Sequence, residues 1–203
     1  AFADNNAKYC LNVFKVQTQN GICFAIVILV MGFWFSESIV QIVYARGDFD
    51  EAATHRIALL FKIGLLSLPM LAICMMATAY LNACKKNLNV LKVSLLSLLV
   101  LPLLAAPGLL NNSETQLMYA VVSFHGLNAI ALLIVIKQKI FGRNALISFD
   151  FIVRIVLTLA PAAIVILLDY LFHIYNIWAK FALLFIGFLF SSYLILGLFR
   201  GKV

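Results

Sequence analysis

Apolar residues fall into six long blocks along the chain, each bounded by charged or asparagine-containing segments. The blocks are Gly21–Tyr44, Ile57–Ala83, Val90–Leu110, Thr115–Ile136, Phe149–Phe172 and Ile177–Phe199. An α-helix needs about 20 such residues to cross the roughly 30 Å hydrocarbon core of a bilayer. The blocks lack the alternation of apolar and polar residues that is typical of strands in membrane β-barrels. The pattern therefore predicts an all-α fold, a polytopic transmembrane bundle of six helices.

The composition supports this fold class. Hydrophobic residues make up 65% of the 203 residues and charged residues 11%, whereas soluble domains average about 45–50% apolar and about 25% charged residues. A water-soluble fold would have too little polar surface to cover so many apolar side chains.

Lysine and arginine residues are unequally divided between the two sides of the predicted membrane. One side carries ten of them, namely Lys8, Lys15, Lys85, Lys86, Lys92, Lys137, Lys139, Arg143, Arg200 and Lys202. The other side carries Arg46, Arg56 and Lys180. Because cytoplasmic loops hold the excess of basic residues, we expect both termini to be cytoplasmic. The net charge of +7 is then explained by anionic headgroups and not by nucleic acid, since the basic residues are spread over four junctions.

The same pattern divides the chain into four parts. Residues 1–20 are expected to be a polar cytoplasmic lead-in, and residues 21–136 four spans. Residues 137–148 are expected to form a cytoplasmic linker, and residues 149–199 two further spans.

Motifs of enzymes and metal sites are missing from the sequence. It has no Gly-rich phosphate loop, no HExxH, no paired CxxC and no GxSxG, and His55, His125 and His173 lack the spacing of metal ligands. The sequence therefore favours a protein that is not an enzyme and that uses neither a metal nor another cofactor.

Two ionisable residues flank the first loop on the extracytoplasmic side. A charge inside a span is costly unless it finds a partner, lines a cavity or reaches the interface. Glu37 and Lys62 lie at similar depths in consecutive predicted spans. We expect them to pair across the hairpin; the alternatives are that Lys62 extends to the interface or that the two residues line a polar substrate cavity.

Two more ionisable residues lie in later spans. His125, beside Gly126, is expected to hydrogen-bond inside the bundle where two helices approach closely, with proton coupling as the alternative. Arg154 follows Asp150 by four residues, a spacing that favours a local ion pair, with contact to an anionic headgroup as the alternative. Asp169 and Lys180 stand near helix ends, where solvation is the ordinary expectation.

Prolines predict bends in three spans. Pro69 lies in the second span, Pro102 and Pro107 in the third, and Pro161 in the fifth. A proline removes an internal hydrogen bond and tends to kink a helix. Such breaks lie near the substrate path in many transporters, but they are also common packing features.

The loop after the first span reads ARGDFDEAATHR, and the next helix continues IALLFKIGL. The segment resembles the MurJ/MviN family of lipid II flippases, within the multidrug/oligosaccharidyl-lipid/polysaccharide exporter superfamily, whose members carry an Arg-Gly-x-Phe loop, a Thr and a Tyr-x-x-Gly-Leu helix. The counterparts in this chain are Arg46, Gly47, Phe49, Thr54, Phe61, Gly64 and Leu65. AFADNN and TAYLNACKKN resemble the segments after the family's eighth and tenth helices, and Arg154 matches an arginine early in its thirteenth helix.

The resemblance implies that the six spans correspond to helices nine to fourteen of a fourteen-helix flippase in the bacterial inner membrane. Residues 21–136 would form part of the C-terminal transporter lobe, and residues 149–199 a groove for the polyprenyl tail. The implied partners are membrane lipid, a polyprenyl-pyrophosphate-linked saccharide, and helices or a partner chain that supply the pyrophosphate-binding arginines. The alternatives are an O-antigen or polysaccharide-precursor flippase and a non-transporting subunit that pairs with another chain.

Overall fold

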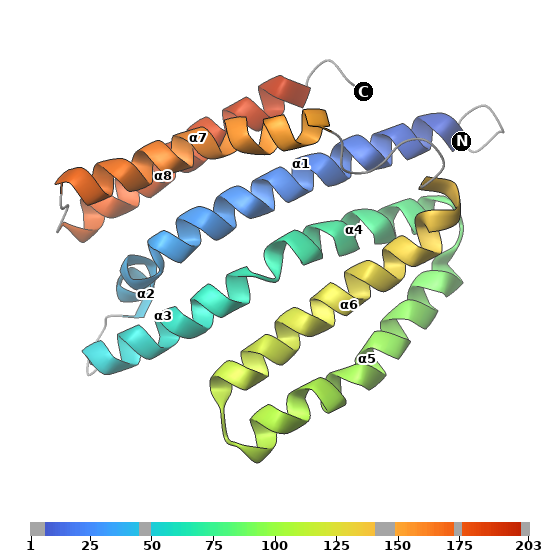
Figure 1. The fold of residues 1–203 in the computed structure, drawn as a ribbon, viewed down its shortest axis with the longest axis horizontal. Coiled ribbons are helices and arrows are strands. Elements are labelled where there is room, and N and C mark those ends of the chain that lie inside the picture. Colours follow the sequence, from blue (N-terminus) through green and yellow to red (C-terminus); the bar gives the residue numbers. More distant parts are fainter. Residues whose placement is uncertain (1–6, 45–49, 141–148, 173–175, 200–203) are drawn as a thin grey trace.

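The computed structural model describes residues 7–44, 50–140, 149–172 and 176–199. Within these ranges the chain is entirely helical apart from short turns (Figure 1). The helices are α1 (Ala7–Trp34), α2 (Ser36–Tyr44), α3 (Glu51–Leu65), α4 (Leu68–Ala83), α5 (Asn87–Leu110), α6 (Glu114–Ile140), α7 (Phe149–Phe172) and α8 (Ile177–Phe199).

Six segments of the described chain are long and apolar enough to cross a membrane. They are Leu11–Trp34, Glu51–Ala83, Asn87–Leu110, Glu114–Ile136, Phe151–Phe172 and Trp178–Ile195. The predicted all-helical fold with six membrane-length segments is thus confirmed, and the segments indicate a multi-pass membrane protein. The side of the membrane that holds the termini stays a prediction.

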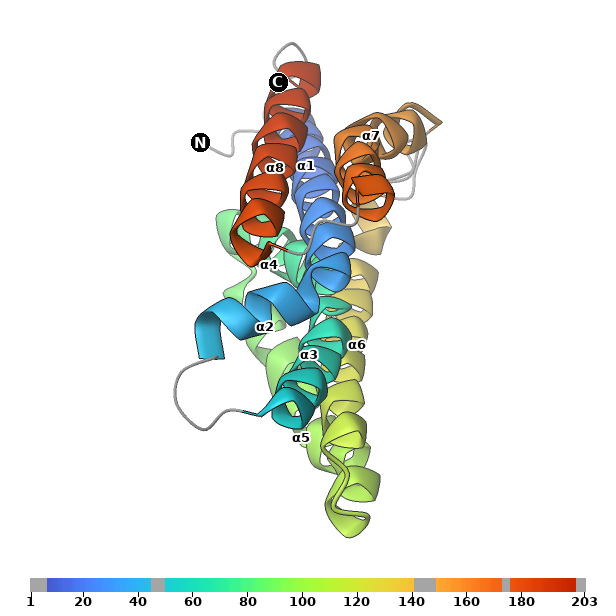
Figure 2. The same cartoon turned by 90° about the vertical axis from the view of Figure 1, so that its left-hand side faces the viewer.

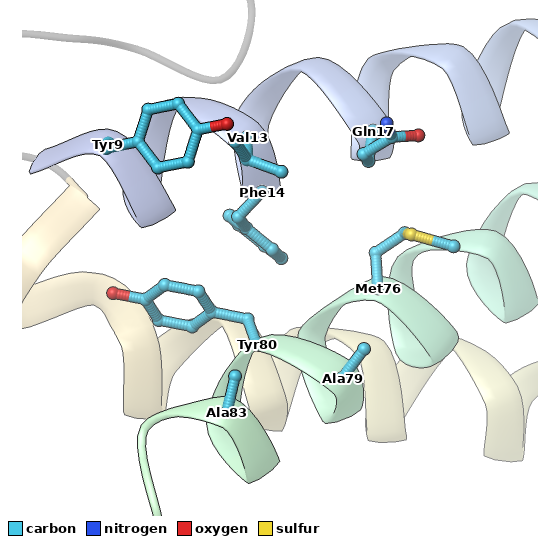
Figure 3. Close-up of a pocket in the computed structure, with 8 residues that line it drawn as sticks. All are labelled: Tyr9, Val13, Phe14, Gln17, Met76, Ala79, Tyr80 and Ala83. Atoms are coloured by element: carbon cyan, nitrogen blue, oxygen red, sulfur yellow. The ribbon is translucent and has the colours of Figure 1, made fainter. Parts of the chain in front are cut away.

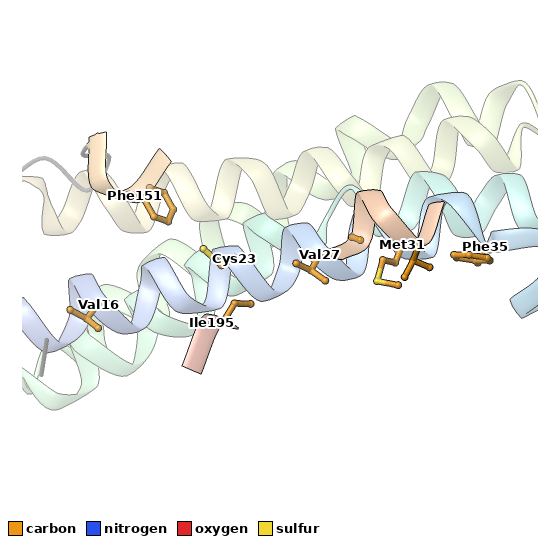
Figure 4. Close-up of a cluster of buried hydrophobic side chains, with 9 residues drawn as sticks. Val16, Cys23, Val27, Met31, Phe35, Phe151 and Ile195 are labelled. Carbon is orange, nitrogen blue, oxygen red and sulfur yellow. The ribbon is translucent and has the colours of Figure 1, made fainter. Parts of the chain in front are cut away.

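The long helix α1 lies at the centre, between the α7–α8 hairpin and the group formed by α3, α4, α5 and α6 (Figures 1 and 2). One buried cluster joins α1 to α7 and α8 through Cys23, Val27, Met31, Ala162 and Ile195, among others (Figure 4). A second cluster joins the first half of α1 to α4, α5 and α6, and includes Phe14, Ala77, Leu81, Val93 and Leu132. Because lipid provides no hydrophobic driving force between helices, close packing of this kind is what holds such a bundle together.

The first span begins earlier and ends earlier than the sequence predicted. Helix α1 starts at Ala7, and the first candidate span starts at Leu11, inside the segment expected as a lead-in. This half of α1 contains polar residues that lower its average hydropathy, but Thr18 and Gln19 are buried, and the Thr18 hydroxyl donates to the carbonyl of Phe14 at 2.7 Å. The hydropathy average misses this half because it counts Thr18 and Gln19 as polar, although these two side chains face the protein.

At its other end, α1 stops at Trp34, and the chain turns at the buried residue Phe35 into α2 (Figure 2). The predicted span Gly21–Tyr44 is therefore wrong at both ends. Helix α2 is amphipathic, since it buries Ser36 and Val40 and exposes Glu37 and Gln41. A short helix of this pattern is typical of the membrane interface.

The second span is discontinuous, as Pro69 predicted. Helix α3 ends at Leu65 and α4 begins at Leu68, with Pro69 in the first turn of α4. The hydroxyl of Ser67 donates to the carbonyl of Gly64 at 2.7 Å, so the break keeps a local hydrogen bond. The helices α5 and α7 continue through Pro102, Pro107 and Pro161.

The fourth candidate span ends at Ile136, and α6 continues to Ile140, so residues 137–140 of the predicted linker are helical; residues 141–148 lie outside the described part of the chain. The helix ends fall into two groups. The end that carries α2, the start of α3 and the α5–α6 turn holds Glu37, Glu51, Glu114 and Asp169, and is called the acidic end below (Figure 1). The opposite end holds the α4–α5 turn with Lys85 and Lys86, and is called the lysine end.

Gly187 of α8 permits the close approach of α8 to α1 and α7, which a larger residue should prevent. A Cβ atom there would lie 2.8 Å from Cε of Met31 and 2.8 Å from Cγ2 of Val165. Overpacking costs about 1–3 kcal/mol, and each kcal/mol lowers the melting temperature of a chain of this size by about 2–4 °C. We expect Gly187→Val to lower the thermal unfolding midpoint in detergent accordingly.

The matched control is Gly126→Val on α6, where an added Cβ meets no atom within 4 Å. This variant should unfold at or slightly above the temperature of the unchanged protein, because valine is a better helix former than glycine. Equal destabilisation by both variants would contradict the packing described here.

Candidate functional site

The family-motif residues are only partly within the described chain. Arg46, Gly47 and Phe49 lie outside the described residues. Thr54 is buried in the first turns of α3, and its hydroxyl donates to the carbonyl of Asp50 at 3.1 Å. A Cβ atom on Gly64 would lie 2.9 Å from Cε of Met118, so this glycine marks a close approach of α3 to α6. Thr54 and Gly64 thus make local structural contacts in α3, the same helix that contains the other two described counterparts, Phe61 and Leu65.

Two acidic residues stabilise the start of α3. The carboxylate of Asp50 accepts a hydrogen bond from the backbone N–H of Ala53 at 2.7 Å and so caps the helix. Glu51 adds a negative charge to the first turn, where the helix dipole favours it.

Glu37 is the centre of a polar group at the acidic end. Its Oε1 atom lies 3.9 Å from Nζ of Lys62 and 3.4 Å from Nδ1 of His55, a contact that is ionic only when the imidazole is protonated. The Lys62 ammonium also lies 5.6 Å from the centre of the Phe33 ring, within cation–π range. The expected Glu37–Lys62 pair is therefore present. Glu37 itself belongs to α2, beyond the first candidate span, and not to the interior of that span.

An open hollow adjoins this group. It has a volume of about 470 Å³ and is lined by Glu37, Gln41, Glu51, Ala52, Thr54 and His55. Since the Glu37 side chain is half exposed, the ion pairs here contribute only about 0–1 kcal/mol each to stability. The hollow can hold water or polar groups, and its role as part of a substrate path stays a prediction.

A second ion pair joins α3 to α6 at the same end. Arg56 donates from Nε to Oε2 of Glu114 at 2.8 Å and from Nη2 to Oε1 at 2.8 Å. This two-point geometry is the strongest form of an arginine–carboxylate contact. It fixes the start of α3 against the start of α6, although both side chains are exposed.

A third polar group joins α1, α7 and α8. The indole N–H of Trp34 donates to Oδ2 of Asp169 at 2.9 Å, and Nζ of Lys180 lies 3.7 Å from Oδ1. The Asp169 side chain is only 8% exposed, and Oδ1 has no hydrogen-bond donor among the described residues. The expectation that Asp169 and Lys180 are ordinary solvated helix ends is thus wrong for Asp169. A buried carboxylate is costly unless it is paired, and the partners of Asp169 come from α1 and α8. This group, called the Asp169 tie below, therefore links three helices.

The spacing along α7 contains a signal for this burial that the sequence interpretation missed. Asp169 follows Thr158, Ala162 and Val165 at intervals of eleven, seven and four residues, and all of them are buried. These intervals place the four side chains on one face of a helix. The carboxylate therefore faces α1 and not solvent.

His125 is not brought together with Glu37 and Lys62. Its ring packs edge-on against Phe124, and its carbonyl accepts a weak hydrogen bond from the Cys74 thiol at 3.7 Å. The expected close helix approach at Gly126 is wrong, since an added Cβ there meets nothing within 4 Å. Proton coupling by His125 stays a prediction.

Arg154 is buried on the face of α7 that packs on α1. Its residue exposure is 9%, and Phe151 and Thr158 of the same face are buried with it. Burial of this degree disfavours open contact with lipid headgroups. The side chain of its predicted partner, Asp150, lies outside the described residues.

The fold places the chain in the class of multi-pass α-helical membrane proteins. Comparisons with protein-family models, with curated proteins and with solved structures found no match. A particular family and function are therefore proposed below from the residues themselves.

The Trp34–Asp169 contact can be measured by a double-mutant cycle. We expect Trp34→Phe and Asp169→Leu each to lower the free energy of unfolding, because each leaves a partly buried polar group without its partner. The double variant should be less destabilised than the sum, with a coupling of about 0.5–3 kcal/mol. Trp178→Phe is the control, since Trp178 is 68% exposed and should show no coupling to Asp169→Leu. Additive effects of Trp34→Phe and Asp169→Leu would show that the Asp169 tie contributes nothing.

Proposed function

We propose that this chain is part of a lipid-linked precursor flippase, with lipid II as the substrate, and that it works by alternating access together with further helices or a partner chain. In such a mechanism two lobes rock about a hydrated cavity that takes the polar headgroup, while the polyprenyl tail stays in lipid. This chain would supply part of one lobe and the two helices α7 and α8.

The observation that carries the proposal is the discontinuous second span. Helices α3 and α4 are separated at Leu66 and Ser67, well inside the candidate span Glu51–Ala83. Leu66 and Ser67 keep helical backbone angles, and their N–H groups bond to carbonyls three residues earlier, so the interruption is a kink before Pro69. Transporters use interrupted helices near their substrate sites. This helix directly follows the Arg-Gly-x-Phe segment that resembles the MurJ/MviN family.

The arrangement of polar groups supports the same proposal. The hollow beside Glu37 adjoins the first turns of α3, at Thr54 and His55. The same candidate span, Glu51–Ala83, therefore has a polar surface at its start and an interruption farther along. The helices α7 and α8 expose large apolar side chains, among them Leu167, Phe185 and Phe190. Such surfaces suit an isoprenoid tail, and they suit bilayer lipid equally well.

Two other functions compete with this proposal. An O-antigen or polysaccharide-precursor flippase would share the mechanism and differ in its headgroup. A non-transporting subunit is favoured by the ties at the acidic end, since Trp34–Asp169 and Arg56–Glu114 join helices far apart in the chain and would suit a rigid scaffold.

A complementation experiment tests the proposal. The chain is expressed with the adjoining or partner segment that supplies the pyrophosphate-binding helices, in bacteria depleted of their own lipid II flippase. We expect growth to recover and the lipid II that accumulates in the cytoplasmic leaflet to fall. The chain expressed alone should insert into the membrane without restoring growth.

Two outcomes would contradict the lipid II assignment. Failure to restore growth despite normal insertion of both parts would exclude it under these conditions. Rescue of cells that lack an O-antigen flippase, without rescue of lipid II export, would transfer the proposal to the other precursor.

A further inference from the structure

An apolar groove lies between α1 and α4 and extends toward the lysine end. It is lined by Tyr9, Val13, Phe14, Gln17, Met76, Ala79, Tyr80 and Ala83, and these side chains point toward one another from the two helices (Figure 3). Its volume of about 250 Å³ is below the roughly 300–1,000 Å³ of pockets that enclose a drug-sized ligand. The groove is therefore too small to enclose a drug-sized molecule, and its volume is compatible with part of an acyl chain.

The surroundings of the groove limit what can fill it. Most of its lining residues belong to the candidate spans Leu11–Trp34 and Glu51–Ala83. The groove would therefore face the lipid of the bilayer. The rings of Phe14 and Tyr80 pack 4.9 Å apart at its floor, and Tyr9 at its end is more than half exposed. Tyrosines at the end of an apolar membrane surface are typical of the headgroup level.

Basic residues stand where the groove ends. Ala83 lines the groove, and Lys85 and Lys86, both exposed, follow it in the α4–α5 turn. Helix α5 begins directly after them, with no acidic residue in its first turn and no side-chain cap hydrogen bond. Two lysines and a helix N-terminus together favour a negative charge at this point.

We propose that the α1–α4 groove and the α4–α5 turn form a binding site for one anionic phospholipid. An acyl chain lies in the groove, and the phosphate headgroup contacts Lys85, Lys86 and the start of α5. The charge at the groove's end selects an anionic over a zwitterionic headgroup, while the apolar walls accept the chain of either. The site depends on the membrane-spanning fold and not on which precursor the protein transports.

Native mass spectrometry of the purified full chain tests this site. The protein is released from micelles that contain equal amounts of phosphatidylglycerol and phosphatidylcholine with identical acyl chains. We expect phosphatidylglycerol to be retained preferentially, and Lys85→Gln with Lys86→Gln to remove most of the preference. Each lysine should contribute about fivefold, which corresponds to ~1 kcal/mol per basic residue at an anionic surface.

The variant Lys92→Gln, which removes an exposed lysine of α5 outside the turn, is the control for charge and should keep the preference. An unchanged preference in the double lysine variant, or an equal loss in Lys92→Gln, would overturn the headgroup assignment.

The acyl chain is tested separately from the headgroup. Ala79→Phe fills the groove and should reduce retention of both lipids, whereas Ala160→Phe, at an exposed position on α7, should not. Photoactivatable phosphatidylglycerol, with the reactive group on the acyl chain, should cross-link the unchanged protein within residues 9–17 and 76–83. Cross-links confined to other helices, or unchanged retention in a correctly folded Ala79→Phe variant, would overturn the proposal.

Discussion

The central helix α1 has to bury two polar side chains, Thr18 and Gln19, between apolar helices, and the rest of the bundle packs around it. Thr18 is as inaccessible as Cys23, and Gln19 is nearly so, although a polar group in a lipid environment is costly unless protein satisfies it. The Thr18 hydroxyl meets this requirement within α1 itself. The clusters on both sides of α1 then explain why α7 and α8, which come last in the sequence, lie against the first helix.

The acidic end of the bundle adds specific contacts to this packing. Asp169 joins α7 to the distant helix α1 and to the next helix, α8, and Arg56 joins α3 to α6, in each case through a charged side chain. Burial makes the Asp169 contact the more consequential, because exposed pairs are weakened by water and salt. The groove at the opposite end has no comparable polar lining except Gln17. One end of the described chain is therefore fixed by polar contacts, and the other presents apolar surface beside lysines.

Hydropathy and proline positions were enough to predict the helical class, the six membrane-length segments and the break near Pro69. The Glu37–Lys62 contact followed from the similar depths of two ionisable residues in consecutive spans. Average hydropathy could not predict the bounds of the first span. Thr18 and Gln19 face the protein, and that burial depends on how the helices pack in the tertiary structure. The turn at Phe35, which moves Glu37 onto α2, has neither a proline nor a glycine at the bend to announce it. Asp169 was misjudged because its place near a helix end suggested solvation, although its spacing from Val165 and Ala162 indicated the buried face.

Hydrogen–deuterium exchange of the protein in lipid nanodiscs tests the central position of α1 most directly. Backbone amides exchange slowly where they are hydrogen-bonded inside a packed or membrane-embedded helix. The structure predicts that amides of residues 11–20 are protected as strongly as those of residues 21–34. Both halves pack on α7 and α8; the first half also packs on α4 to α6, and the second on α3 and α4 at Gly32 and Gly21. Rapid exchange through residue 20, with protection beginning only at Gly21, would contradict the account and restore the polar lead-in that hydropathy alone suggests.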